Sequence, residues 1–233
     1  MDRAAPRPLI QAVVFDLGGV LLDWNPRHLY RKLFADEAEM ERFLAEVCTM
    51  AWHDAHDRGL PPHEGCAKLS DAHPEYQAEI MAWAQRGEEM IAGPIHGSVQ
   101  LLDELRTRGV GCYALTNMEA ETYPLRRARF EFLGWFDGTV VSGQERVAKP
   151  DPEIFTLLLE RFGLLAETTV MIDDSPRNLE TARALGLQTV CFQSPGQLRA
   201  WLADAGLVDP EPPAPTRPRP MPSRPRLTRP PSR

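Results

Sequence analysis

The residue best placed to do chemistry in this chain of 233 residues is Asp16. It ends an apolar stretch, Leu9 to Phe15, that has the composition of a buried strand, and it is followed by Leu17, Gly18 and Gly19. Glycines permit an abrupt turn and let a ligand approach the backbone closely. A carboxylate at this position is placed either to react as a nucleophile or only to cap the turn, and the motif alone leaves both interpretations open.

A second polar group follows the predicted strand Val110 to Leu115. Thr116 and Asn117 offer a hydroxyl, an amide and free backbone N–H groups, which are the donors that hold phosphate oxygens. The same pair is also ordinary turn chemistry after a strand.

Lys149 lies in the segment VAKPDPEIF, where Pro150 and Pro152 restrict the backbone before a helix. A lysine fixed in this way can neutralise a phosphate group or an attacking carboxylate. Taken alone, the residue is better interpreted as a solvated surface lysine.

Asp173 and Asp174 follow the apolar strand Thr169 to Ile172. Two adjacent carboxylates at a buried strand end repel each other unless a proton or cation compensates, so the pair indicates a hard metal such as magnesium. An acidic helix N-terminus would account for one of the two aspartates better than for both.

The elements that position these residues alternate between strands and helices. Further strands are predicted at Thr139 to Ser142 and Gln188 to Phe192, and helices at Gly97 to Arg108, Glu119 to Arg129, Pro152 to Phe162, Pro176 to Leu185 and Pro195 to Ala203. This rhythm predicts an α/β fold with a doubly wound parallel sheet, whose ligands bind at the carboxyl ends of the strands. The four polar groups should therefore meet at one edge of one sheet.

Three segments divide the chain. Residues 24–93 carry helical patterning without a convincing strand and form a predicted all-helical insertion, and residues 1–23 with 94–207 form the α/β core. Residues 208–233, rich in proline and arginine, are expected to be a disordered tail. The composition does not identify a partner for this tail.

Composition restricts the class of protein. The net charge of −7 argues against nucleic acid as a partner of the core, and no apolar stretch is long enough to cross a membrane. Four scattered cysteines fit neither a metal knuckle nor a disulfide framework, which favours reduced and mostly buried thiols. Without a signal-peptide pattern at the N-terminus, we expect a cytoplasmic protein.

Taken in order, the motifs resemble those of the haloacid dehalogenase (HAD) superfamily. The matching segments are FDLGGVLLD around Asp16, LTN at Thr116 and Asn117, AKPDPEIF at Lys149, and MIDDSPRN around Asp173 and Asp174. The resemblance implies a Rossmann-like core, identifies the helical insertion as a cap domain, and makes HDRG at His56 to Gly59 similar to a cap segment of sugar-phosphate phosphatases.

The resemblance also implies a mechanism, in which Asp16 attacks phosphorus and water then hydrolyses the aspartyl phosphate. Mg²⁺ would be held by Asp16, the Gly18 carbonyl and Asp174, with Asp173 close by. The catalytic residues Thr116, Asn117 and Lys149 would hold the transferring oxygens. The expected substrate is a small phosphorylated metabolite similar to a sugar phosphate.

One position departs from the pattern of the superfamily. Its phosphatases usually have a second aspartate, the general acid and base, two residues after the nucleophile, and this chain has Gly18 there. Asp23 or the cap residues His53, His56 and Asp57 are candidates to replace that acid.

Two other functions stay open at this stage. A 2-haloacid dehalogenase would use Asp16 to displace halide, a leaving group that needs no proton, although paired aspartates beside an anionic substrate are unfavourable. A non-catalytic binding module would keep the fold without the chemistry, but an intact Asp16, Lys149 and Asp174 argue against it.

Overall fold

The core of the protein is a five-stranded parallel sheet. The structure, a computed structural model, describes residues 9–211, so most of the expected tail lies outside the described residues. The strands, in spatial order, are β5 (Gly138–Val141), β4 (Gly111–Thr116), β1 (Ala12–Phe15), β6 (Thr169–Asp173) and β7 (Gln188–Cys191). β1 lies in the middle, with Phe15 opposite both Ala114 of β4 and Ile172 of β6. The doubly wound α/β fold is confirmed.

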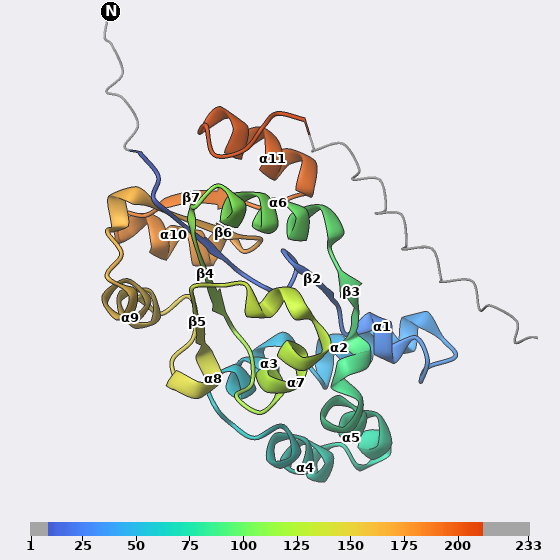
Figure 1. Cartoon of the computed structure of the whole chain (residues 1–233). Coiled ribbons are helices and arrows are strands. Elements are labelled where there is room, and N and C mark those ends of the chain that lie inside the picture. Colours follow the sequence, from blue (N-terminus) through green and yellow to red (C-terminus); the bar gives the residue numbers. More distant parts are fainter. Residues whose placement is uncertain (1–8, 212–233) are drawn as a thin grey trace, which may run out of the picture.

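Helices cover both faces of the sheet (Figure 1). They are α6 (His96–Thr107) and α11 (Pro195–Asp204) on one face, and α9 (Pro152–Phe162) and α10 (Pro176–Ala184) on the other. Side chains of β1 alternate between these layers: Val13 and Phe15 pack with Leu101 of α6, whereas Val14 packs with Phe155 of α9. The central strand is therefore buried on both sides, as its continuous apolar sequence predicts.

The helix starts follow ordinary capping rules. α9, α10 and α11 each begin with proline, whose fixed φ suits the first turn, and the Ser194 side chain accepts a hydrogen bond from the backbone N–H of Gln197. Two shorter helices connect strands of the core, α7 (Thr122–Arg129) and α8 (Ser142–Glu145). Single 3₁₀ turns occupy Pro74–Tyr76, Gly87–Met90, Glu131–Gly134 and Ala166–Thr168.

The inserted segment builds a helical unit with its own apolar core. Its helices are α1 (Arg27–Tyr30), α2 (Glu37–Glu46), α3 (Met50–Asp57), α4 (Pro62–Ala72) and α5 (Gln77–Arg86). Tyr30, Phe43 and Trp83 are almost fully buried among them. Figure 1 shows these helices gathered at the end of the sheet where the strands finish. We refer to this unit as the cap.

Two short strands that the sequence pattern did not predict flank the cap. β2 (Leu22–Trp24) and β3 (Ile91–Pro94) pair antiparallel where the chain leaves the core and returns to it. With three and four residues, one strand containing glycine and proline, they have too little alternation to be recognised. The segment 24–93 is thus helical except at its two ends.

The expected boundary of the C-terminal tail at residue 208 is too early. Val208 is buried in the core cluster that contains α6 and α11. The next residue, Asp209, donates its backbone N–H to Glu104 at 3.0 Å, and its carbonyl accepts a hydrogen bond from Arg199 at 2.9 Å. The packed part of the chain therefore extends through Asp209, and residues 212–233 lie outside the described part.

Two other expectations can be compared with the structure. Within residues 9–211, no helix is both long and apolar enough to cross a membrane. The four cysteines are free thiols; Cys48, Cys66 and Cys112 are buried as expected, whereas Cys191 is exposed.

The burial of Val208 leads to a stability prediction. Val208→Ala should lower the free energy of unfolding by roughly 1.5–3 kcal/mol, because two buried methyl groups are lost and a cavity remains. Leu165→Ala is the matched control, since Leu165 is 57% exposed and should change stability little. Urea denaturation of the full chain measures both, and equal midpoints for the two variants would contradict the packing described here.

Candidate active site

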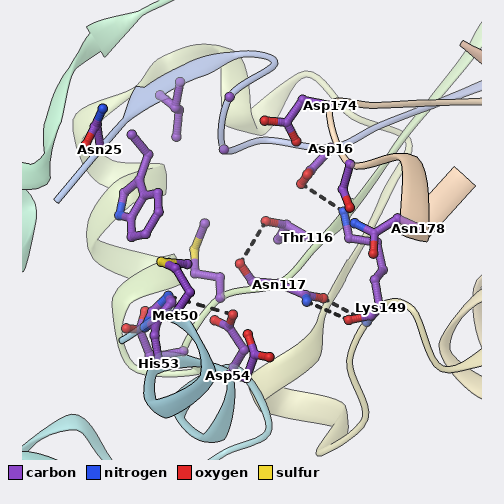
Figure 2. A pocket seen from close by; sticks show the side chains of 18 of the residues that line it. Asp16, Asn25, Met50, His53, Asp54, Thr116, Asn117, Lys149, Asp174 and Asn178 are labelled. Atoms are coloured by element: carbon purple, nitrogen blue, oxygen red, sulfur yellow. Dashed lines mark hydrogen bonds and ion pairs between the residues drawn. The ribbon is translucent and has the colours of Figure 1, made fainter. Parts of the chain in front are cut away.

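Three of the predicted residues meet at the carboxyl edge of the sheet. Asp16 follows β1, Thr116 ends β4 and Asp173 ends β6, and these three strands are neighbours. The strand order reverses at β1, which is where ligands of doubly wound sheets bind. Lys149 reaches the same point from the loop between α8 and α9 rather than directly from a strand end (Figure 2).

Lys149 is the electrostatic centre of the site. Its Nζ lies 3.0 Å from Asp16 Oδ1 and 2.7 Å from Asp173 Oδ2, and the residue is almost fully buried. Burial alone would lower the pKa of Lys149, but the two carboxylates outweigh it and hold that pKa above its ordinary value. The side chain is therefore a fixed buried cation and not the surface lysine that its sequence alone allowed.

Asp173 is fully saturated by the protein. Besides Lys149, it accepts hydrogen bonds from the backbone N–H of Ser175 at 2.8 Å and from the Asn178 amide at 3.0 and 3.1 Å. Both carboxylate oxygens are engaged, and the side chain has no solvent exposure. These contacts suit an anchor for Lys149 better than the metal ligand expected from the sequence.

Asp16 keeps one oxygen for chemistry. Oδ1 accepts the backbone N–H of Leu17 at 2.7 Å and the Lys149 ammonium, whereas Oδ2 has no hydrogen bond among the described residues. Burial raises the pKa of Asp16 to about 7, against the lowering effect of Lys149, and Asp173 adds to the increase. The Lys149 ammonium alone therefore does not keep the pKa of Asp16 at its ordinary value.

The two glycines after Asp16 are not equivalent. Gly19 has φ of +71°, and a Cβ built there would lie 2.2 Å from Asp174 Oδ2, so only glycine fits beneath that carboxylate. At Gly18 the φ angle is not in the left-handed region, and an added Cβ would meet only Trp24 Cβ, at 4.0 Å. Gly19 is therefore required for the turn, whereas position 18 has room for a side chain.

The acidic groups fit a hard divalent cation. One oxygen each of Asp16, Asp173 and Asp174 lies within 4.8 Å of the others. Asp174 forms no ion pair among the described residues, and burial together with nearby Asp173 raises its pKa. Three carboxylates face a single lysine, and carboxylate oxygens are the ligands that Mg²⁺ prefers. Asp16 and Asp174 retain oxygens for such an ion, next to the Gly18 backbone.

The predicted phosphate-holding pair divides into two roles. The Asn117 side chain donates to the Lys149 carbonyl at 2.9 Å and accepts the Lys149 N–H at 2.8 Å, so it clamps the lysine loop (Figure 2). The oxygen and one N–H of the amide are thus engaged, so Asn117 has only its second N–H left for a substrate oxygen, and its main contacts are not the phosphate contacts that the sequence predicts. Thr116 is 1% exposed and lines the cavity, where its hydroxyl makes only a long contact of 3.5 Å to the Asn117 carbonyl.

The cap closes the site into a cavity of about 520 Å³. Asp16, Thr116, Lys149 and Asp174 form its core wall, and the opposite wall comes from the cap. This second wall consists of residues of the cap helices and of the two strands beside them. The lining residues include Met50, His53, Asp54, Asp57 and Arg58 from the cap, Trp24 from β2 and Ile91 from β3. The volume suits a small metabolite.

The structure separates the four candidates for the missing acid. Asp23 is mostly exposed and pairs with His28, and His56 is buried with its Nδ1 near the Leu60 carbonyl; neither belongs to the described cavity wall. His53 and Asp57 do line the cavity. The His53 ring stacks on Trp24, with centroids 5.4 Å apart.

Several residues of the site were not found from the sequence. Glu119 and Arg126 line the cavity from the core side, and Arg58 of the cap forms a two-pronged ion pair with Asp151 at the start of α9. Asn178 was noted only as part of a motif, although its position in the first turns of α10 places it near Asp173. Glu119 and Arg126 carry no sequence signal, because only tertiary packing brings them to the cavity.

Comparison with known proteins assigns the family. The profile of the haloacid dehalogenase-like hydrolases matches residues 10–186, most of the described chain. The protein therefore belongs to the haloacid dehalogenase-like hydrolase family and is a hydrolase. This finding argues against the non-catalytic binding module.

The chain is similar to proteins named as phosphatases. It is 28% identical to a sesquiterpene phosphatase of Aspergillus oryzae, over 76% of this chain and 87% of that protein. It is 25% identical to a phosphorylated carbohydrates phosphatase of Thermotoga maritima, over 78% of this chain and 84% of that protein.

Two solved structures share the fold. One is a HAD family enzyme of Bacteroides thetaiotaomicron in complex with magnesium and inorganic phosphate, with a TM-score of 0.59, 24% identity, and coverage of 79% of this chain and 95% of that one. The other is L-2-haloacid dehalogenase of Xanthobacter autotrophicus, with a TM-score of 0.58, 18% identity, and coverage of 85% and 84%. At these identities the likeness shows the fold alone.

The different contacts of the adjacent aspartates lead to a matched prediction. In metal-free protein, Asp173→Asn should lower the free energy of unfolding by roughly 3–5 kcal/mol, because it leaves Lys149 buried with one carboxylate fewer. Asp174→Asn removes a charge that burial already disfavours, so the free energy of unfolding should stay unchanged or rise slightly. Thermal or urea unfolding in EDTA measures both, and a larger loss for Asp174→Asn would reverse the two roles.

Proposed function

We propose that the protein is a Mg²⁺-dependent phosphatase of a small phosphorylated metabolite, similar to a sugar phosphate, and that it acts through an aspartyl-phosphate intermediate on Asp16. The observation that carries the proposal is the charge arrangement at the sheet edge: a buried carboxylate with one free oxygen, a fixed lysine beside it, and a further carboxylate, Asp174, across Gly19. The phosphatase names of the relatives support it.

In the first step, the free oxygen of Asp16 attacks phosphorus in line and forms the new P–O bond. The bond to the leaving oxygen breaks, and its electron pair departs with that oxygen, which must gain a proton. Lys149 and the backbone around Thr116 stabilise the charge on the transferring oxygens. Asp173 and Asn117 keep Lys149 in place, so they act on the reaction by positioning.

In the second step, water attacks the phosphorus of the acyl phosphate. The P–O bond to Asp16 breaks, which releases inorganic phosphate and restores the carboxylate. Mg²⁺, bound by Asp16, Asp174 and the Gly18 carbonyl, would supply positive charge for a dianionic phosphate group.

The main alternative is a 2-haloacid dehalogenase. Gly18 favours it, because halide leaves without a proton. The unpaired Asp174 argues against it, because that carboxylate would lie beside the negative charge of a haloacid without compensation. Phosphate release from a panel of sugar phosphates in a Mg²⁺ titration, run beside halide release from 2-chloropropionate, distinguishes the two. Halide release that needs no magnesium would overturn the phosphatase.

The proposed nucleophile leads to a direct prediction. Asp16→Asn should abolish turnover and leave the fold intact, because the amide matches the carboxylate in shape but is a poor nucleophile. Steady-state phosphate release measures activity, and circular dichroism measures the fold. Activity near that of the wild type would exclude a covalent role for Asp16.

A second prediction concerns the metal. Asp174→Asn should shift half-maximal activation to a much higher Mg²⁺ concentration, since a charged ligand becomes neutral. Asp23→Asn is the control, because Asp23 is an exposed carboxylate outside the described cavity wall. The measurement is the rate of phosphate release against Mg²⁺ concentration. Coincident curves for the wild type and Asp174→Asn would show that Asp174 is not a metal ligand.

A further inference from the structure

The first step of the proposed reaction requires a proton donor that the nucleophile's own loop does not contain. A sugar or alkyl oxygen is a poor leaving group unless it is protonated as the bond to phosphorus breaks. Gly18 has no side chain, and Lys149 is held between Asp16 and Asp173, on the side of the nucleophile. The donor must therefore come from another part of the cavity.

In-line attack fixes where that donor must lie. The leaving oxygen departs on the side of phosphorus opposite Asp16, and across the cavity from Asp16 stands the cap wall (Figure 2). Helix α3 supplies His53 and Asp57 to this wall, separated by one helical turn. They are the two cap candidates that line the cavity.

The surroundings of Asp57 favour a neutral carboxylic acid. The side chain is only 7% exposed; Oδ2 lies 3.7 Å from His53 Nε2, and Oδ1 has no hydrogen-bond partner among the described residues. A buried carboxylate with an unpaired oxygen is costly, whereas the protonated form carries no charge to desolvate.

Nearby charges act in the same direction. Burial raises the pKa of Asp57 to about 8, and three acidic groups facing it add to the increase: Glu119 after β4, Asp54 on its own helix, and Asp16 across the cavity. Arg126 of α7 opposes them but does not reverse the shift. Position and charge thus place a proton on the wall that faces the leaving group.

We propose that Asp57 is the general acid of this enzyme: its carboxyl group protonates the leaving oxygen, and its carboxylate then accepts a proton from the attacking water. The proposal rests on the proposed phosphatase function. In the first step, the O–H bond of Asp57 breaks as the O–H bond of the leaving alcohol forms. In the second, a proton from water restores the acid, so each turnover returns Asp57 to its starting state.

His53 is a positioning residue in this arrangement. Burial lowers the pKa of His53 to about 4, despite the opposing effect of Glu119, so its ring is neutral at neutral pH. The ring is held by Trp24 at 5.4 Å and Trp83 at 5.0 Å between centroids, and its Nε2 faces Asp57. A neutral ring in a fixed orientation can orient the carboxyl group without taking its proton.

The test compares two aryl phosphates of similar shape that differ in leaving group. Phenyl phosphate needs its leaving oxygen protonated, whereas 4-nitrophenyl phosphate departs far more readily without a proton. With Mg²⁺ present, Asp57→Asn should reduce kcat/KM for phenyl phosphate by roughly 10²- to 10⁴-fold and change the value for 4-nitrophenyl phosphate much less. Asp71→Asn is the matched control, since it removes an exposed carboxylate of cap helix α4, outside the described cavity wall, and should keep the wild-type ratio of the two rates.

A second measurement uses the wild-type protein, in case Asp57→Asn does not fold. The ratio of kcat/KM for phenyl phosphate to that for 4-nitrophenyl phosphate should fall as the pH rises through about 8, because the donor loses its proton. A ratio that does not vary with pH, or equal losses on both esters in a folded Asp57→Asn, would overturn the assignment and leave the phosphatase standing. No turnover of either ester by the wild type would overturn the phosphatase and this assignment together.

Discussion

The ammonium group of Lys149, held between Asp16 and Asp173 in the interior of the protein, is the interaction on which the site depends. A buried cation is stable only when its partners are fixed and satisfied. Asn117 fixes the backbone of Lys149, and Ser175 and Asn178 saturate the far carboxylate. The result is that the carboxylate of Asp16, the proposed nucleophile, is oriented from one side and has its other oxygen without a hydrogen bond among the described residues. Each of these partners comes from a strand end or a helix start at the same sheet edge, so the chemistry follows from the fold.

This arrangement leaves a surplus of negative charge, and the surplus defines what the cavity can bind. Asp174 adds a carboxylate that no described lysine or arginine pairs with, so a cation is needed before an anionic substrate can approach. The cap supplies the opposite wall, where Trp24 and His53 stack and Asp57 is buried. The ion pair between Arg58 and Asp151 joins that wall to the core beside Lys149. In the proposed reaction, the core compensates the charge of the substrate, and the leaving group faces the cap.

Much of this could be predicted from sequence, because the relevant signals are local. Apolar stretches ending in Asp16, Thr116 and Asp173 mark three strand ends, and the parallel topology brings them together. The different roles of Asp173 and Asp174 were not distinguished, because both follow the same apolar stretch and only the contacts of Asp173 with Lys149, Ser175 and Asn178 separate them. The roles of Asn117 and Glu119, the strands beside the cap and the burial of Val208 depend on tertiary contacts between distant segments. These contacts join residues that lie far apart in the chain, so no short stretch of sequence predicts them.

The most direct test of the account is to identify the covalent state of Asp16 during turnover. The wild-type protein is mixed with Mg²⁺ and a phosphate ester that it hydrolyses, then treated with borohydride, which reduces an acyl phosphate to the alcohol, and the peptide containing position 16 is analysed by mass spectrometry. We expect homoserine in place of Asp16, absent when the ester is omitted. An unmodified Asp16 in protein that is turning over the ester, with another carboxyl group reduced in its place, would contradict the account.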